Sequence, residues 1–329
     1  MLYSTIVNYA HELGFAAAGF CSTNVFEEQR ELVEKQPQLR ERKQLLFDPS
    51  ADHPWAKSLL VLLWPYAQAS VPEEQDRVFV DCYYSASNRA YQAAKELEMR
   101  IIESGIRAKA NVPYPAKAAA VRAGLGLIGD HSLLINPEYG TRVVIILVAL
   151  DVDAPDTDEP LNEQSCLHCG KCTAACPTGA IQKDGMTHPE RCLRNYMLEG
   201  IVVPEHMRSQ MGMKLVGCDM CQRVCPMQPA YGSEQGLSFC LDDFLTTDED
   251  CFKESVSRLA CVIGRNVARP QRIRAQAALL AGNRKRAEDL CVLKEWMKSD
   301  FDAVKVHASW ACSQIEKHIQ GLDQREEKR

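Results

Sequence analysis

The sequence predicts an α+β protein in three consecutive parts, which we place at residues 1–160, 161–232 and 233–329. Three observations support this division. Helical patterns alternate with apolar strands in the first part, cysteines concentrate in the second, and the third is nearly all helical pattern. With 46% hydrophobic and 25% charged residues, the composition excludes disordered, collagen-like and coiled-coil chains and is typical of a globular protein.

The first part combines helical periodicity with continuous apolar runs. Helical spacing in Met1–Gly14 is followed by a short strand pattern at Phe15–Cys21. The runs Ser58–Trp64 and Arg142–Leu150 predict buried strands, the second of them covered on both faces. We therefore expect an α/β domain. Its remaining predicted helices are Glu27–Gln44, Tyr91–Ser104 and Ala116–Ala123.

The third part is predicted to be a stack of paired helices. Short links such as Gly282-Asn283 separate the helical segments, which is the arrangement of a HEAT-like unit. The predicted helices are Ser257–Asn266, Pro270–Ala281, Ala287–Ser299 and Ala303–Ile319.

The sequence favours a cytoplasmic protein with no membrane partner. Its longest apolar run, Val143–Leu150, is too short to span a bilayer. Met1–Phe15 carries His11 and Glu12 where a secretory signal needs an apolar stretch. In a reducing compartment, we expect the 15 cysteines to bind metal rather than pair as disulfides.

The cysteine-rich part begins with a C-x2-C-x2-C-x3-C-P run, the spacing with which bacterial ferredoxins hold [4Fe–4S] clusters. A second run, from Cys218 to Cys225, is one cysteine short, and Cys192 between the runs supplies it. The cysteine before each proline reaches the other cluster. We predict a ferredoxin-like domain with two clusters. Their ligands are Cys166, Cys169, Cys172 and Cys225 for one, and Cys176, Cys192, Cys218 and Cys221 for the other.

A zinc ribbon and a set of disulfides are the alternatives for these cysteines. Zinc needs four thiolates arranged as two separated pairs, which does not account for eight cysteines with both prolines. Two clusters without a further site would make the protein a plain electron carrier.

A glycine-rich segment, residues 123–139, lies between the predicted strands of the first part. Gly124, Gly126 and Gly129 allow the backbone to approach a bulky ligand closely. Their G-x-G-x-x-G spacing follows a helical stretch rather than a strand, so it does not indicate a dinucleotide site. From this pattern alone, a generic turn is as consistent as a cofactor loop.

The segments RAGLGLIGDHSLLINPEYG, CLHCGKCTAACPTGAI and RIRAQAALLAGN, in this order, resemble the epoxyqueuosine reductase family, and the similarity runs nearly end to end. The resemblance implies a cobalamin-dependent iron–sulfur oxidoreductase of tRNA queuosine biosynthesis. In such an enzyme, electrons pass through both clusters to low-valent cobalt of a base-off corrinoid held by the first domain, and an epoxide oxygen is removed. The corrinoid-binding positions implied here are Gly124, Gly126, Ile128, Gly129, His131 and Ser132.

This chain departs from the family at one functional position. The catalytic Asp that the resemblance implies is replaced by Ala110, so the catalytic residue is unknown. A paralogue that reduces another substrate, or that reactivates a corrinoid protein, is therefore the alternative enzyme. The acids nearby in sequence that could replace the Asp as proton donor are Asp81, Tyr84, Tyr91 and Tyr114.

Positive charge concentrates in Lys253–Arg286, which has nine basic residues and one acid in a chain of net charge −6. Such a stripe can follow an RNA phosphate backbone, and tRNA is the expected partner. A solvated face, or contact with the acidic linker Asp151–Glu163, is the alternative. We also expect a monomer supplied by an external low-potential electron donor, with His307 at a surface or capping position. The candidate RNA-binding residues are Arg265, Arg269, Arg272, Arg274, Arg284, Lys285 and Arg286.

Overall fold

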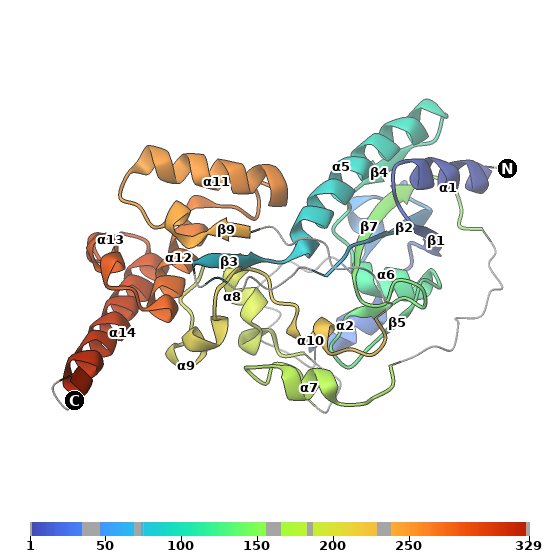
Figure 1. Ribbon diagram of the computed structural model, residues 1–329. Helices are drawn as coiled ribbons and strands as arrows, with labels where there is room; N and C mark the ends of the chain where they lie inside the picture. Colours follow the sequence, from blue (N-terminus) through green and yellow to red (C-terminus); the bar gives the residue numbers. More distant parts are fainter. Residues whose placement is uncertain are drawn as a thin grey trace. The chain divides into compact units, whose positions relative to one another are not determined.

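A computed structural model describes residues 2–34, 47–68, 74, 76–155, 166–182, 187–228 and 238–326, with side chains as far as residue 321. The chain forms two compact units (Figure 1). Unit 1 consists of residues 1–66, 86–170 and 225–230, and unit 2 of residues 67–85, 171–224 and 231–329. Because these units interleave segments of the chain, the three-part division along the sequence stays a prediction.

Unit 1 is built on a four-stranded sheet of order β1-β2-β7-β4 in which all neighbouring strands are antiparallel. Its central strands are the two apolar runs, β2 (Ser58–Pro65) and β7 (Val143–Leu150), which pair along their full length. Every residue from Leu59 to Leu63 is fully buried, so β2 is covered on both faces. The outer strands are β1 (Ala17–Ser22) and β4 (Ala108–Ala110).

A short alanine-rich helix, α6 (Ala116–Arg122), covers one face of this sheet. Ala119 and Ala120 lie in one hydrophobic cluster with Leu59 and Val61, and their small side chains let the helix backbone approach the strands. After α6, the chain forms the small hairpin that carries the glycine-rich segment. The other elements are α1 (Leu2–Glu12), α2 (Glu27–Glu34), α4 (Pro49–Asp52), α5 (Cys82–Glu103), β5 (Leu127–Ile128) and β6 (Leu134–Ile135).

Unit 2 contains a three-stranded sheet with β3 (Arg77–Val80) in its centre. This strand is parallel to β8 (Lys214–Val216) and antiparallel to β9 (Ser238–Cys240). Short helices surround the cysteines of this unit. They are α7 (Lys171–Ala175), η1 (Pro189–Arg191), α8 (Leu193–Glu199), α9 (Glu205–Arg208), η2 (Ser209–Met211) and α10 (Met220–Arg223).

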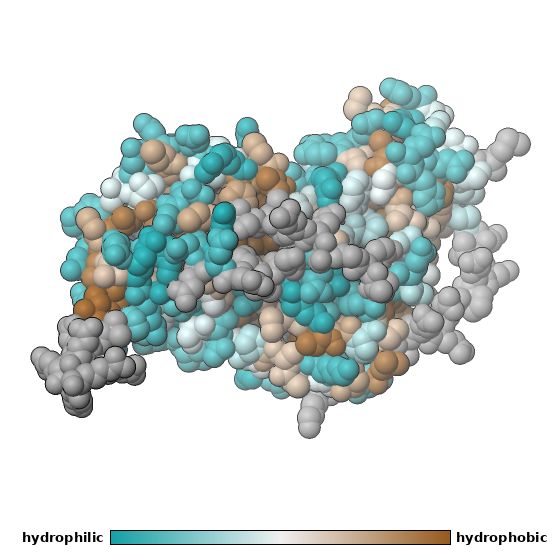
Figure 2. Space-filling model, in the orientation of Figure 1, coloured by the Kyte–Doolittle hydropathy of each residue, from teal (hydrophilic) through white to brown (hydrophobic). Residues whose placement is uncertain are grey.

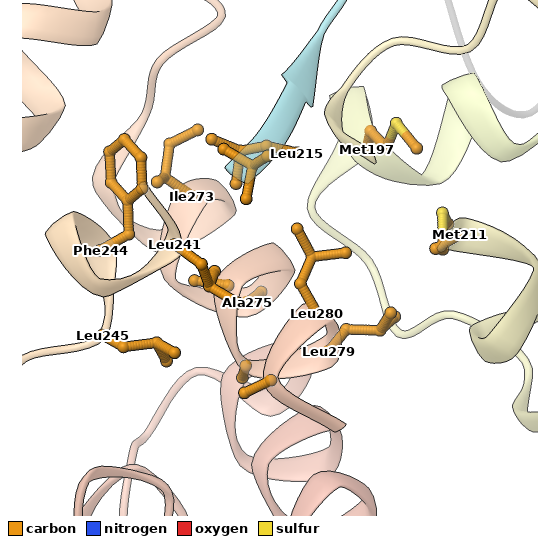
Figure 3. Close-up of a cluster of buried hydrophobic side chains, with 14 of the residues drawn as sticks. Met197, Met211, Leu215, Leu241, Phe244, Leu245, Ile273, Ala275, Leu279 and Leu280 are labelled. Carbon is orange, nitrogen blue, oxygen red and sulfur yellow. The ribbon is translucent and has the colours of Figure 1, made fainter. Parts of the chain in front are cut away.

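The carboxy-terminal segment of unit 2 is helical, as the sequence predicts. Its central helix, α12 (Pro270–Arg284), packs against α14 (Asp302–Glu326) and buries nearly every residue from Ile273 to Gly282. One core joins this segment to the cysteine-bearing part, because Met197 and Leu215 share a cluster with residues of α12 (Figure 3). The remaining elements are η3 (Leu241–Phe244), α11 (Glu249–Ile263), η4 (Ala287–Asp289) and α13 (Leu290–Trp296).

His307 corrects one expectation, because it is 1% exposed rather than at the surface. Its Nδ1–H donates to the carbonyl of Ala275 at 2.9 Å, and its Nε2 accepts the N–H of Val203 at 2.9 Å. The imidazole therefore joins α14, α12 and the segment before α9 within the core of unit 2.

The face shown in Figure 2 is mostly hydrophilic, with hydrophobic side chains gathered in small separate patches. In the part of the chain that the structure describes, every helix is too short or too polar to cross a bilayer.

Candidate functional site

The glycine-rich segment forms a tight, internally bonded loop in unit 1. β5 and β6 pair with Leu127 opposite Ile135. The turn between them is closed by the N–H of Gly129, which donates to the carbonyl of Leu133 at 3.0 Å. The side chain of Asn136 also donates to the carbonyl of Leu125 at 2.8 Å. The loop is therefore held in shape by hydrogen bonds between its own residues.

Gly126 and Gly129 both lie close to residues of the opposite side of the hairpin. A Cβ at Gly126 would lie 2.3 Å from the carbonyl oxygen of Ile135, and the φ of Gly126 is +148°. A Cβ at Gly129 would lie 2.7 Å from the side chain of Ile135. Gly126 is thus required by the close approach of the Ile135 backbone, whereas the neighbours of Gly129 are side-chain atoms.

His131 is the most informative of the predicted cofactor residues. It is 4% exposed, and its Nδ1 accepts the N–H of Leu133 at 3.2 Å. Burial lowers its pKa to about 4, so the ring is neutral near pH 7 and its proton lies on Nε2. This Nε2 is buried and lacks a hydrogen-bond partner among the described residues. A bound group with an acceptor oxygen, such as a corrin amide, fits this donor.

The remaining predicted positions of the loop surround His131. Ile128 is 42% exposed and presents an apolar side chain. Ser132 has a φ of 58°, and its carbonyl accepts a hydrogen bond from Lys117 at 2.6 Å. Gly124 follows α6 with a φ of +71°, and space around it is open within 4 Å in the described structure.

The loop contacts the first cysteine run within unit 1. A carboxylate oxygen of Asp130 lies 2.9 Å from Nδ1 of His168, which stands between Cys166 and Cys169. The ligand atoms of Asp130, Cys166 and His168 all lie within 4.8 Å of one another. The glycine-rich segment and the first cluster segment are therefore neighbours in the same unit.

The ligands predicted for the second cluster all belong to unit 2, where their thiols crowd together. Burial raises the pKa of the Cys221 thiol far above its ordinary value, and nearby thiolates raise it further. Burial likewise raises the pKa of Cys218 to about 11. Such crowding disfavours bare thiolates but suits a positively charged iron core that neutralises them. The thiols that affect Cys221 are those of Cys218, Cys192, Cys176 and Cys172.

The surroundings of Cys176 favour the thiolate form of its side chain. Burial opposes its ionisation, but hydrogen bonds from the chain at Thr178, Ala180 and Ile181 lower its pKa overall. One of these donors, the N–H of Ala180, lies 3.2 Å from the sulfur. N–H donors of this kind stabilise cluster sulfur ligands.

Three of the predicted ligands of the first cluster belong to unit 1, namely Cys166, Cys169 and Cys225. The segment that carries Cys225 is anchored in unit 1 by Gln228. Its amide bonds to Thr141 and accepts a hydrogen bond from Arg142 at 3.4 Å.

Among the candidate acids, Asp81 and Tyr84 are buried in unit 2. Burial and then the charge of Asp219 raise the pKa of Asp81 to about 6. The N–H of Tyr83 donates to its carboxylate at 3.0 Å and opposes this shift. Burial also raises the pKa of the Tyr84 hydroxyl, which makes it a poorer proton donor.

The other candidate positions lie in unit 1. Tyr91 is 41% exposed, with the ammonium group of Lys95 over its ring. The Tyr114 hydroxyl is already engaged, because it bonds to His53 and donates to the carbonyl of Pro49 at 3.2 Å. Burial also raises the pKa of Tyr114 to about 12. Tyr114 is therefore not a free proton donor.

Sequence reasoning did not identify Glu98 of α5, whose carboxylate accepts the N–H of Ala110 at 2.9 Å. It also forms an ion pair with Lys109 at 3.3 Å. The carboxylate of Glu98 is thus bonded to the backbone of the residue where the resemblance places an Asp. A lone Glu on a helical pattern gives no signal for this contact in the sequence.

The predicted basic stripe is only partly exposed. Arg265, Arg269 and Lys285 are exposed, whereas Arg272 is half-buried and packs against Gly200. Arg274 pairs with Glu249 at 2.7 Å and lies over the ring of Phe252. The sequence places Arg274 on an exposed stripe, but in the structure its guanidinium is already engaged by these two contacts.

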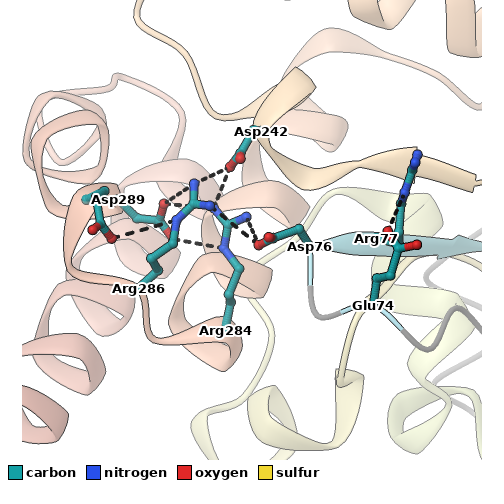
Figure 4. A network of polar contacts seen from close by, with 8 residues as sticks. Glu74, Asp76, Arg77, Asp242, Arg284, Arg286 and Asp289 are labelled. Atoms are coloured by element: carbon teal, nitrogen blue, oxygen red, sulfur yellow. Dashed lines mark hydrogen bonds and ion pairs between the residues drawn. The ribbon is translucent and has the colours of Figure 1, made fainter.

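Arg284 and Arg286 also differ from the expectation of a solvated stripe. They form an ion-pair network with three aspartates (Figure 4). The Arg284 side chain is only 2% exposed and its partner Asp289 only 3%. Neither arginine is available to phosphate without breaking these pairs. The other two aspartates are Asp76 and Asp242.

Comparison with known proteins agrees with the fold and the cysteine pattern. Residues 165–228 match the family model of the 4Fe-4S double cluster binding domain. The epoxyqueuosine reductase of Bacillus cereus is 26% identical over 285 residues, covering 80% of this chain and 73% of that protein. The Bacillus subtilis epoxyqueuosine reductase is 25% identical and covers 95% and 88%.

A solved structure shares the fold over the whole chain. It is an epoxyqueuosine reductase crystallised with a tRNA-Tyr epoxyqueuosine-modified stem loop. The TM-score is 0.80 at 24% identity, covering 100% of this chain and 94% of that one. These comparisons confirm the α+β fold class, the predicted pair of [4Fe–4S] clusters and the resemblance to this group of oxidoreductases.

Proposed function

We propose that this protein, a homologue of the epoxyqueuosine reductases, is a cobalamin-dependent iron–sulfur reductase that removes the epoxide oxygen from a modified tRNA base. The observation that carries this proposal is the loop of His131, a formed hairpin with an unused buried donor that adjoins the first cluster segment. When bound, the clusters would deliver single electrons and the corrinoid would supply a low-valent metal for the reduction.

The loop residues would bind and orient the corrinoid. His131 would donate from Nε2 to an amide oxygen of a corrin side chain, because this N–H has no acceptor among the described residues. Ile128 would offer its exposed apolar side chain to the ring system. Gly126 and Gly129 would keep the hairpin tight enough to hold both groups in place.

Among the candidate acids, Asp81 of unit 2 has the pKa nearest to neutral pH. A carboxyl group whose pKa is raised to about 6 retains its proton more readily near neutral pH than an exposed one. Tyr84 and Tyr114 are poorer acids, since burial raises the pKa of both hydroxyls. The change Asp81→Asn removes the proton while keeping the shape of the side chain.

The proposed macromolecular partner is tRNA, bound in part by exposed basic residues near α12. Arg265, Arg269 and Lys285 are free of the ion pairs that occupy Arg274 and Arg284 in the described structure. We further propose that the protein acts in the cytoplasm as a monomer and receives electrons from an external low-potential donor.

An anaerobic turnover assay tests this function. The full-length protein, with iron and sulfide measured, is incubated with cobalamin, a low-potential reductant and epoxyqueuosine-containing tRNA. Queuosine-tRNA should appear only when cobalamin is present. Turnover by Asp81→Asn, compared with turnover by the unaltered protein, tests whether this acid is required.

Ala110 favours a second candidate, a paralogue with the same cofactors and another substrate. Protein that binds cobalamin and loads both clusters, yet leaves epoxyqueuosine-tRNA unchanged, would support this paralogue instead. If the protein loads its clusters but does not bind cobalamin, the remaining function is that of an electron carrier.

A further inference from the structure

The hydrogen bond between Asp130 and His168 joins two segments that the proposed function assigns to different cofactors. Asp130 lies in the turn of the glycine-rich hairpin, and His168 lies 38 residues later, between two predicted cluster ligands. Both residues belong to unit 1. A shift of either segment must therefore be transmitted to the other, or this hydrogen bond must break.

The backbone at His168 directs the imidazole toward this contact. Its φ of 48° lies in the left-handed region, which is unfavourable for a non-glycine residue. The next residue but one, Gly170, also has a positive φ of 70°. A glycine at position 168 would adopt the turn without this cost, so the imidazole is present at an energetic disadvantage.

The contact contributes little to the stability of the fold. The His168 side chain is 75% exposed and that of Asp130 is 22% exposed. Exposed pairs of this kind add little to the stability of a protein. Both segments also expose a large apolar side chain, Ile128 at 42% and Leu167 at 62%. The pair therefore lies among surfaces that suit a ligand rather than within a packed core.

We infer that the Asp130–His168 hydrogen bond is a positioning contact that couples the corrinoid loop to the first cluster segment. This inference rests on the proposed function. Asp130 fixes the loop against the peptide of Cys166 and Cys169, so the ordered cluster segment favours the loop conformation that binds cobalamin. Because coupling between two sites is reciprocal, cobalamin also favours the ordered cluster segment.

A double-mutant cycle on the cluster-loaded, full-length protein tests this coupling. Hydroxocobalamin affinity is measured anaerobically for Asp130→Ala, His168→Gly and the double variant. Gly suits the backbone at position 168 and removes only the side chain. Each single change should weaken binding about threefold to fivefold, and the double variant should be no weaker than either single one. Asp130→Asn keeps an acceptor and should restore most of the affinity.

Lys117→Met provides the matched control. It removes a hydrogen bond to Ser132 in the same loop without touching the cluster segment. Its effect on cobalamin affinity should add to that of His168→Gly. As a second measurement, the EPR spectrum of the reduced first cluster should respond to cobalamin in the unaltered protein and respond less in Asp130→Ala.

The outcomes separate this inference from the function on which it rests. If the unaltered protein binds no cobalamin, the proposed function fails and this coupling fails with it. If cobalamin binds normally but the effects of Asp130→Ala and His168→Gly simply add, the coupling alone is refuted. Iron and sulfide content, measured for each variant, shows that a loss of affinity does not come from a lost cluster.

Discussion

The guanidinium of Arg284 donates to the carboxylate of Asp289 at 2.7 Å, and both side chains are almost completely buried. Arg284 also pairs with Asp76 at 2.9 Å and Asp242 at 2.7 Å, which come from the segment before β3 and from η3. One side chain at the end of α12 thus holds three segments of unit 2 together (Figure 4).

Replacing Arg284 with Met should destabilise the fold by about 3 kcal/mol, because it leaves the buried carboxylate of Asp289 with only the more distant Arg286 as its cation among the described residues. Lys285→Met removes the same charge from an exposed neighbouring position and should change stability by less than about 0.5 kcal/mol. Chemical denaturation of both variants measures the difference. Equal stabilities would show that the network is not structural.

His307 should make stability sensitive to mild acid. Burial lowers its pKa from 6.5 to about 4, so the unfolded chain takes up a proton at a higher pH than the folded protein does. Its contribution is therefore complete above about pH 6.5 and is lost as the pH falls toward about 4. When the pH falls from about 7.5 to about 5.5, this residue should lower the free energy of unfolding by about 1 kcal/mol.

The variant His307→Leu tests this assignment. It should lose about 2 kcal/mol at neutral pH, because the N–H of Val203 and the carbonyl of Ala275 lose their partner. Its stability should also fall less steeply between the two pH values than that of the unaltered protein. An unchanged slope would mean that His307 does not titrate as described. His131, also buried with a lowered pKa, contributes equally to both proteins.

The ligand pairing is tested by cysteine-to-serine variants. Cys192→Ser and Cys176→Ser should each remove the second cluster, or about four iron atoms per chain, and the double variant should lose no more than either. Cys225→Ser combined with Cys176→Ser should lose both clusters. Iron analysis and EPR distinguish these results. The proposed pairing is wrong if Cys192→Ser with Cys176→Ser empties both sites.

The exposed basic residues should contribute to tRNA binding through phosphate contacts. Charge reversal at Arg265 and Arg269 should weaken binding of a tRNA stem loop and lower the salt dependence by about 0.7 to 0.9 per lost contact. Lys305→Glu, on an exposed position of α14, is the control and should leave the affinity unchanged. Binding titrations at several salt concentrations measure both the affinity for the stem loop and its salt dependence. Equal weakening by the control would indicate only a loss of overall charge.

Long, strongly patterned elements of the fold were predictable, and short ones were not. The apolar runs became β2 and β7, buried on both faces although the sheet is antiparallel. Strands β3, β8 and β9 have three or four residues, too few for a periodic signal. Helix α5 begins at Cys82, whereas the sequence predicts a start at Tyr91. The polar residues between these positions face outward in part and mask the helical pattern in the sequence.

The candidate site also combines features that the sequence predicts with features that it does not. The cysteine spacing is local, since a cluster needs closely spaced thiolates, and the sequence therefore reveals it. The contact of Asp130 with His168 joins residues 38 positions apart and leaves no pattern in the sequence. Counting charges near Arg284 could not show that it is buried, because its aspartate partners lie far away along the chain.

Anaerobic titration of the cluster-loaded protein with hydroxocobalamin shows whether the loop of His131 binds a corrinoid. We expect saturable binding of one corrinoid with a base-off absorption spectrum, and about fivefold to tenfold weaker binding by His131→Phe, which lacks the buried Nε2 donor. Protein with both clusters intact and no affinity for cobalamin would contradict this expectation.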